Sequence, residues 1–185
     1  IQSPRLTEKS LNIFYEKDYR KLLLGTNDIG QDDFDRGHRR GEKILGFLKN
    51  HNLSFDKKTV VEIGSGSGGI LKCFQDHNST VYGCEVDRQC LAISKKMGIN
   101  TVSGTIEMFV VKNIRADLVI LSHILEHLPK PFDFLSTLHK ILTKDATVYI
   151  QLPGIKNESE NFFRGMQVAH LYYYDLSTLT WMMEQ

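Results

Sequence analysis

The chain has 185 residues, of which 41% are hydrophobic and 24% charged, a balance that is ordinary for a globular protein. The formal net charge of +1 gives no indication of a nucleic-acid or anionic-membrane partner, and no apolar run reaches the roughly 18 residues of a membrane-spanning helix. The 3 cysteines contain no C-x-x-C pair, which argues against a disulfide framework or a zinc ribbon, so we expect reduced thiols in a cytoplasmic protein.

The first part of the chain is predicted to be helical and separate from the rest. Residues 7–24 carry spaced apolar and aromatic side chains among charges, and residues 25–35 are a polar, Gly- and Asp-rich loop. We therefore expect an N-terminal helical cap over residues 1–34 and a main domain over residues 35–185. The main domain begins with a helix over residues 35–50.

Strands and helices alternate through the main domain. This alternation predicts an α/β fold, a three-layer sandwich with a mostly parallel, doubly wound sheet. A polar stretch then precedes a last helix, for which Asp175 or Ser177 supplies the N-cap. The predicted strands are 59–63, 80–84, 100–104, 116–122 and 146–152, and the predicted helices are 67–77, 87–97, 106–113 and 131–143.

A glycine-rich loop follows the first predicted strand, in the segment "VVEIGSGSGGI" at 60–70. Gly64, Gly66 and Gly69 fit the dinucleotide pattern G-x-G-x-x-G, and the first two also fit G-x-G-x-G with Gly68. In an open α/β sheet, this first βα loop is where a ligand binds. A P-loop nucleotide site is excluded because no Gly-Lys-Ser/Thr follows. The glycines alone leave the choice of cofactor open.

Two acidic residues flank this loop in the predicted fold. Glu85 ends the second predicted strand, where its carboxylate could accept the ribose hydroxyls of several cofactors. Glu62 lies within the first strand, at a position where a dinucleotide site has an apolar residue. A buried carboxylate is costly unless a polar group or ligand interacts with it. Together these residues resemble motif I of the class I S-adenosylmethionine-dependent methyltransferases, apolar-apolar-D/E-x-G-x-G-x-G.

The resemblance continues through residues 35–185, in "VYGCEVD", "SGTIEMF", "ADLVILSHILEHLPKPFDFLSTLHKIL", "ATVYIQLPG" and "HLYYYDLSTLTWMME". It implies a Rossmann-like methyltransferase fold that binds S-adenosylmethionine. The family's sheet ends in an antiparallel hairpin of strands 6 and 7, and this chain stops before that hairpin, so we expect a sheet without it. The cofactor-binding residues that the resemblance implies are Glu62, Gly64, Ser65, Gly66, Gly68, Glu85, Val86, Thr105, Ile106, Ser122 and His123.

The segment "HILEH" also spells the inverted zincin motif H-x-x-E-H, with His123 and His127 as zinc ligands and Glu126 as base. The motif follows directly on a strand, and Pro129 and Pro131 leave barely one turn of helix. The sequence also identifies no third ligand, which a zinc site requires. We therefore expect a loop that lines the cofactor site, and no metal.

The predicted function is methyl transfer from S-adenosylmethionine to an O, N or C nucleophile of a small molecule, such as a sugar or another metabolite. In-line displacement needs no metal, and His127 and His170 are the candidate general bases. The sequence has no stripe of clustered basic residues of the kind that indicates a nucleic-acid substrate. It also carries no signal for an oligomeric state. Two alternatives remain: an NAD(P)-dependent oxidoreductase, which would lack a Tyr-x-x-x-Lys pair here, or a catalytically degenerate methyltransferase-fold partner subunit.

Overall fold

The computed structural model describes residues 29–153 and 170–184, together with Thr7, Ser10, Ile13, Phe14, Lys21, Leu22 and Gly25. Most of the predicted N-terminal cap and the polar stretch at 154–161 lie outside the described residues. The chain divides into two compact units. The larger contains residues 28–121 and 137–149, and the smaller contains residues 122–136 and 150–185 together with 1–27. We describe each by itself.

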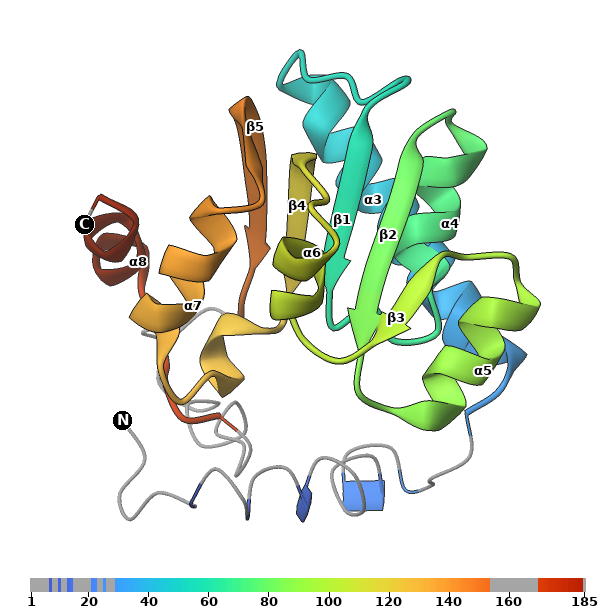
Figure 1. The fold of residues 1–185 in the computed structure, drawn as a ribbon, viewed down its shortest axis with the longest axis horizontal. Helices are drawn as coiled ribbons and strands as arrows, with labels where there is room; N and C mark the ends of the chain where they lie inside the picture. Colours follow the sequence, from blue (N-terminus) through green and yellow to red (C-terminus); the bar gives the residue numbers. More distant parts are fainter. Residues whose placement is uncertain are drawn as a thin grey trace, which may run out of the picture. The chain divides into compact units, whose positions relative to one another are not determined.

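A five-stranded sheet of order β3-β2-β1-β4-β5 organises the fold (Figure 1). Strand β1 pairs in parallel with β2 and β4, and β2 pairs in parallel with β3. The start of β4 bonds to the start of β5, through Ala116 N–H and the Ile141 carbonyl at 2.7 Å. The end of β4 bonds to the end of β5 through His123 N–H and the Gln151 carbonyl at 2.9 Å, so this pair is parallel too. The strands are β1 (Thr59–Ile63), β2 (Thr80–Glu85), β3 (Thr101–Ser103), β4 (Ala116–Ser122) and β5 (Leu142–Gln151).

Helices connect the strands as the α/β prediction requires, which confirms the predicted fold class. In the larger unit, α3 and α4 lie behind the central strands in Figure 1 and α6 lies in front. Asp87 caps α5 by accepting from the N–H groups of Gln89 and Cys90. The helices are α3 (Gln31–Asn50), α4 (Gly69–Asp76), α5 (Arg88–Lys96), α6 (Glu107–Val111), α7 (Pro131–His139) and α8 (Leu176–Met183), with the 3₁₀ turn η1 (Leu125–His127).

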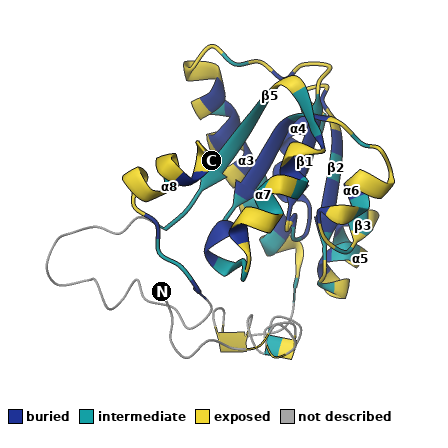
Figure 2. Cartoon of the chain, turned by 60° about the vertical axis from the view of Figure 1, so that its left-hand side comes forward, coloured by how far each residue is buried: buried dark blue, intermediate teal, exposed yellow. Residues whose placement is uncertain are grey.

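The core of the larger unit lies between β1, β2 and β4 and the helices α3 and α4 (Figure 2). The continuous apolar runs of β1 and β4 are buried on both faces, as expected of central parallel strands. Full burial of a side chain such as Phe74 or Leu118 contributes about 1.5–3 kcal/mol. The three cysteines are buried and free, as predicted.

Helices α3 and α4 approach closely because glycines face each other. A methyl group at Gly69 would lie 2.6 Å from the His38 nitrogen and 2.8 Å from the Gly37 carbonyl carbon. One at Gly41 would lie 2.7 Å from Cβ of Cys73. The backbones can meet at this distance only without side chains, so these glycines set the packing of α4, the helix that follows the glycine loop.

Three predicted boundaries are wrong by four residues each. Helix α3 starts at Gln31 rather than at residue 35, because Asp33 accepts a hydrogen bond from Gly30 N–H at 3.0 Å and acidic residues occupy its first turn. The predicted helix 131–143 ends at His139, and β5 starts at Leu142 rather than at residue 146. Pairing of this segment with β4 outweighs its helical periodicity.

The smaller unit contains η1 and α8 among its described residues. Asp175 is the N-cap of α8 and accepts from Thr178 N–H at 2.7 Å, which confirms one of the two predicted caps. Among the residues that the structure describes, no helix has the length and apolar character needed to cross a bilayer.

Candidate functional site

The glycine loop between β1 and α4 adopts a backbone that side chains disfavour. Gly64, Gly66 and Gly68 have φ angles of 66°, 53° and 85°. Left-handed backbone costs an ordinary residue about 1–2 kcal/mol, whereas glycine adopts it freely. Among the described residues, a methyl group at Gly66 would meet no atom within 4 Å. Gly64 is exposed and Gly66 is half-buried, so these two positions leave backbone accessible to a ligand, whereas Gly68 is buried against Ser94 and Ile99.

Glu85 at the end of β2 holds this loop in place. Its Oε2 accepts from Gly66 N–H at 2.8 Å, and its Oε1 accepts from the N–H groups of Val86 and Asp87 at 2.7 and 2.9 Å. Ser65 N–H donates to the Cys84 carbonyl at 3.0 Å. The structure therefore brings together the predicted loop residues and the predicted ribose carboxylate.

Glu62 is buried in β1 below the loop. The residue is 2% exposed, and among the described residues its Oε2 has no hydrogen-bond partner. Burial raises the pKa of Glu62 well above its usual range, the nearby Glu85 raises it further, and the positive charge of Arg40 lowers it. An unsatisfied buried polar group costs about 1–3 kcal/mol. A polar ligand at the loop would offset that cost, so these residues fit a cofactor with an amino-acid moiety.

Val86, Thr105 and Ile106, three of the predicted cofactor-binding residues, differ in what they offer a ligand. Val86 is 58% exposed, which is unusual for a large apolar residue and leaves its surface free for a ring. The Thr105 hydroxyl donates to Glu107 on α6. The Ile106 side chain is 1% exposed, so in this structure mainly its backbone can meet a ligand.

Gly83 in β2 is a further site residue that sequence reasoning missed. A methyl group there would lie 2.5 Å from the Ser65 hydroxyl oxygen and 2.8 Å from Leu71 Cδ1. Because Gly83 has no side chain, the glycine loop can lie directly over β2. Glycine within a predicted strand often marks such a close approach and could have revealed it.

In the smaller unit, Ser122 is the last residue of β4 and His123 follows it. The Ser122 hydroxyl donates to Gln151 Oε1 at 3.1 Å. His123 has φ of 59°, a strained backbone for a non-glycine residue, and its Nδ1 lies 3.3 Å from Glu126 Oε1. Strain of this kind is concentrated at functional sites, which is consistent with the prediction that His123 belongs to the cofactor site.

The two candidate bases meet in the same unit. The rings of His127 and His170 have centroids 4.9 Å apart. Backbone bonds fix this contact, because the N–H groups of Leu171 and Tyr172 both donate to the Glu126 carbonyl, at 2.8 and 3.2 Å. Burial lowers the pKa of His170, and the neighbouring His127 lowers it further.

The geometry that an inverted zincin motif requires is not formed. Leu125–His127 is a 3₁₀ turn rather than an α-helix, so His123 and His127 do not lie one helical turn apart on one face. The structure nevertheless brings a further histidine, His170, close to the motif. One potential metal-binding atom from each of Glu126, His127 and His170 lies within 4.8 Å of the others.

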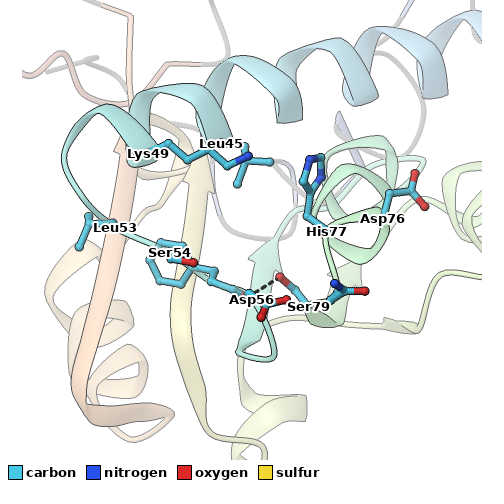
Figure 3. A pocket seen from close by; sticks show the side chains of 10 residues that line it. Leu45, Lys49, Leu53, Ser54, Asp56, Asp76, His77 and Ser79 are labelled. Carbon is cyan, nitrogen blue, oxygen red and sulfur yellow. Dashed lines mark hydrogen bonds between the residues drawn. The ribbon is translucent and has the colours of Figure 1, made fainter.

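A hollow of about 260 Å³ lies elsewhere in the larger unit (Figure 3). Its lining includes Leu53, Phe55 and Asp56 before β1 and His77 and Ser79 before β2, with Ser79 bonded to the Phe55 carbonyl at 2.8 Å. These residues precede the amino ends of the strands. Cofactors of open α/β sheets bind at the carboxyl ends, so this hollow is not the cofactor site.

Comparison with known proteins agrees with the geometry. The family profile described as a methyltransferase domain matches residues 36–185. No curated protein matches the sequence. This family assignment removes the reason to consider an NAD(P)-dependent oxidoreductase.

Solved structures show the same fold. An S-adenosylmethionine-dependent methyltransferase from Archaeoglobus fulgidus is 21% identical with a TM-score of 0.63, over 82% of this chain and 71% of that one. Phosphoethanolamine N-methyltransferase 2 of Haemonchus contortus, solved with S-adenosyl-L-methionine, is 12% identical with a TM-score of 0.69, over 100% of this chain and 45% of that one. Magnesium protoporphyrin IX methyltransferase of Synechocystis PCC 6803 is 14% identical with a TM-score of 0.53, over 74% and 68%. The chain thus belongs to the methyltransferase-domain family and has its Rossmann-like fold.

Proposed function

We propose that the chain transfers the methyl group of S-adenosylmethionine to an O, N or C nucleophile of a small molecule. The observation that carries this proposal is the cradle at the carboxyl ends of β1 and β2. It combines a left-handed glycine loop, the carboxylate of Glu85 that holds the loop, and the buried Glu62, whose Oε2 has no hydrogen-bond partner in the part of the chain that the structure describes.

The chain's own residues suit this cofactor in charge and shape. S-adenosylmethionine carries no phosphate, and the loop at 64–68 contains no Lys or Arg. The loop amides and Glu62 would hold the amino-acid moiety, with the charge of Arg40 nearby. Glu85 would accept the ribose hydroxyls, and the exposed Val86 would pack against adenine.

When bound, S-adenosylmethionine supplies a methyl group already activated by a sulfonium, so metal-independent in-line displacement needs mainly alignment and exclusion of water. Positioning of this kind can supply roughly 7–11 kcal/mol of the barrier. We propose that His127 and His170 accept the proton of a hydroxyl acceptor. Their ring contact supports this role, and so does the buried Nδ1 of His170, which has no hydrogen-bond partner within the described residues.

The similarity to solved methyltransferases supports a small-molecule acceptor, such as a sugar or another metabolite. Two of the solved relatives are named for phosphoethanolamine and for magnesium protoporphyrin IX, both small molecules. A cytoplasmic location is supported by the three free thiols.

The test is an acceptor screen with methyl-labelled donor on the protein. We expect label transfer to a small molecule, and we expect His127→Gln to slow transfer to a hydroxyl acceptor by about 10²–10⁴-fold without weakening cofactor binding. Cofactor binding without transfer to any acceptor would instead favour a degenerate partner subunit. The absence of cofactor binding would refute the proposal altogether.

A further inference from the structure

A buried cluster of two imidazoles and a carboxylate occupies the smaller unit. Glu126 and His127 belong to the turn η1, and His170 begins the described segment that follows β5. Besides the bonds to the Glu126 carbonyl, the Tyr172 hydroxyl donates to the Pro129 carbonyl at 3.3 Å. The cluster is therefore held by backbone and side-chain bonds rather than by chance contact of exposed side chains.

The polar atoms of this cluster lack the partners that burial requires. Glu126 is 1% exposed and His170 is 4% exposed. Within the described chain, Glu126 Oε2 and His170 Nδ1 have no hydrogen-bond partner. Buried polar groups are nearly always paired, so two unpaired atoms in one cluster point to a missing ligand.

The arrangement suits a transition-metal ion. One ligand atom from each of Glu126, His127 and His170 lies within 4.8 Å of the others. A tetrahedral zinc ion with bonds of about 2.0–2.1 Å brings its ligand atoms to about 3.3 Å from one another, a contraction that side-chain rotation can provide. Two imidazoles with one carboxylate form a known zinc ligand set that leaves a fourth position open, and imidazoles disfavour Mg²⁺ and Ca²⁺.

His123 supplies the orienting contact that metal ligands usually have. Its Nδ1 lies 3.3 Å from Glu126 Oε1, the oxygen that also lies 3.9 Å from His127 Nε2. Partners of this kind fix the direction of a ligand, and their loss typically costs 10–100-fold in metal affinity. In this arrangement His123 orients the carboxylate and does not bind the ion.

We propose that Glu126, His127 and His170 bind one divalent transition-metal ion, with zinc as the probe. The ion would fix His170 against η1. Binding of the ion does not depend on the proposed methyl transfer. Its consequence for catalysis does rest on that function: a metal-bound His127 cannot accept a proton, so zinc would slow transfer to a hydroxyl acceptor and a chelator would restore it.

The first test is zinc titration of the metal-free protein by calorimetry, followed by thermal unfolding. We expect one zinc ion per chain and, at a free zinc concentration of 100 times Kd, an unfolding midpoint higher by about 5–11 °C, reversed by a chelator. Because this measurement uses the unaltered chain, it remains decisive even where a variant fails to fold. No stoichiometric binding, or binding without a change in the midpoint, would overturn the proposal.

Variants identify the ligands. His170→Gln and Glu126→Gln should each weaken zinc binding by more than 100-fold, and His123→Ala by about 10–100-fold. The matched control is His139→Ala, an exposed histidine at the end of α7, which should bind zinc as the unaltered chain does. Equal binding by His170→Gln and the control would show adventitious binding elsewhere and refute the site. Cofactor binding, measured on the same samples, reports separately on the proposed function.

Discussion

Gly69 belongs to a ligand-binding glycine pattern and also lies where two helices pack closely. A single substitution tests which of these two roles requires the glycine. It is the third glycine of the dinucleotide pattern, yet in the structure it starts α4 against α3. In Gly69→Ala the new methyl group would lie 2.6 Å from the His38 nitrogen and 2.8 Å from the Gly37 carbonyl carbon, and closer still to the Phe34 carbonyl oxygen. All three are backbone atoms, so relief requires the two helices to separate.

The expected loss follows from these distances. Carbon contacts prefer about 3.5 Å or more, so the helices must move apart by roughly 1 Å. Overpacking of this kind costs about 1–3 kcal/mol. The control is Gly46→Ala, in α3, where a methyl group meets nothing within 4 Å and better helix propensity stabilises by up to about 1 kcal/mol. The two variants should therefore differ by about 1–4 kcal/mol.

Thermal unfolding without ligand measures this difference. In a domain of this size 1 kcal/mol shifts the midpoint by about 2–4 °C, so Gly69→Ala should unfold about 2–16 °C below Gly46→Ala. Cofactor affinity, measured below the unfolding range, should change less for Gly69→Ala than for Gly66→Ala. If Gly69→Ala matched Gly46→Ala in stability but lost the cofactor, the packing role would be wrong.

Three further outcomes follow from the same structure. Gly66→Ala should lower stability by only about 1–2 kcal/mol, for its left-handed backbone, while calorimetry shows at least a tenfold loss of S-adenosylhomocysteine affinity; unchanged affinity would contradict this. Asp175→Ala removes the N-cap of α8 and should cost about 1 kcal/mol, with faster hydrogen exchange at the Thr178 amide as the check. Burial, then Glu85, raises the pKa of Glu62, so the folded state binds a proton that the unfolded state releases and stability falls as pH rises above about 4.3. Glu62→Gln should therefore gain stability relative to the unaltered chain between pH 4.5 and 7.5 in denaturant titrations, and a constant difference would contradict the assignment.

The parallel sheet was predictable because its central strands are nearly continuous apolar runs. The bounds of β1 and β4 coincide with the predicted 59–63 and 116–122. The choice of cofactor class was also predictable, since it depends on local chemistry: a carboxylate in β1 and another at the end of β2. Both acids lie where that reading requires, and hydrogen bonds join Glu85 to the loop.

Contacts between distant segments were not predictable from periodicity. The helix at 131–143 ends early because its last residues pair with β4, a partner that its own apolar spacing does not reveal. In the sequence, Gly41 is an irregular residue within a helix and Gly69 is part of a loop. Their role in packing appears only when α3 and α4 come into contact, which the sequence pattern does not show. His127 and His170 were each nominated, but only the bonds between Leu171, Tyr172 and the Glu126 carbonyl show that they meet.

The central claim is that the cradle of the glycine loop and Glu85 binds S-adenosylmethionine. Calorimetry with S-adenosylhomocysteine tests it most directly, on the unaltered protein, on Glu85→Ala, and on Glu42→Ala as the control for loss of an exposed carboxylate on α3. We predict one-to-one binding by the unaltered protein and by Glu42→Ala. We predict at least tenfold weaker binding by Glu85→Ala, which loses both the ribose acceptor and the bond to Gly66 N–H. No binding by the unaltered protein, or equal binding by Glu85→Ala, would contradict the account.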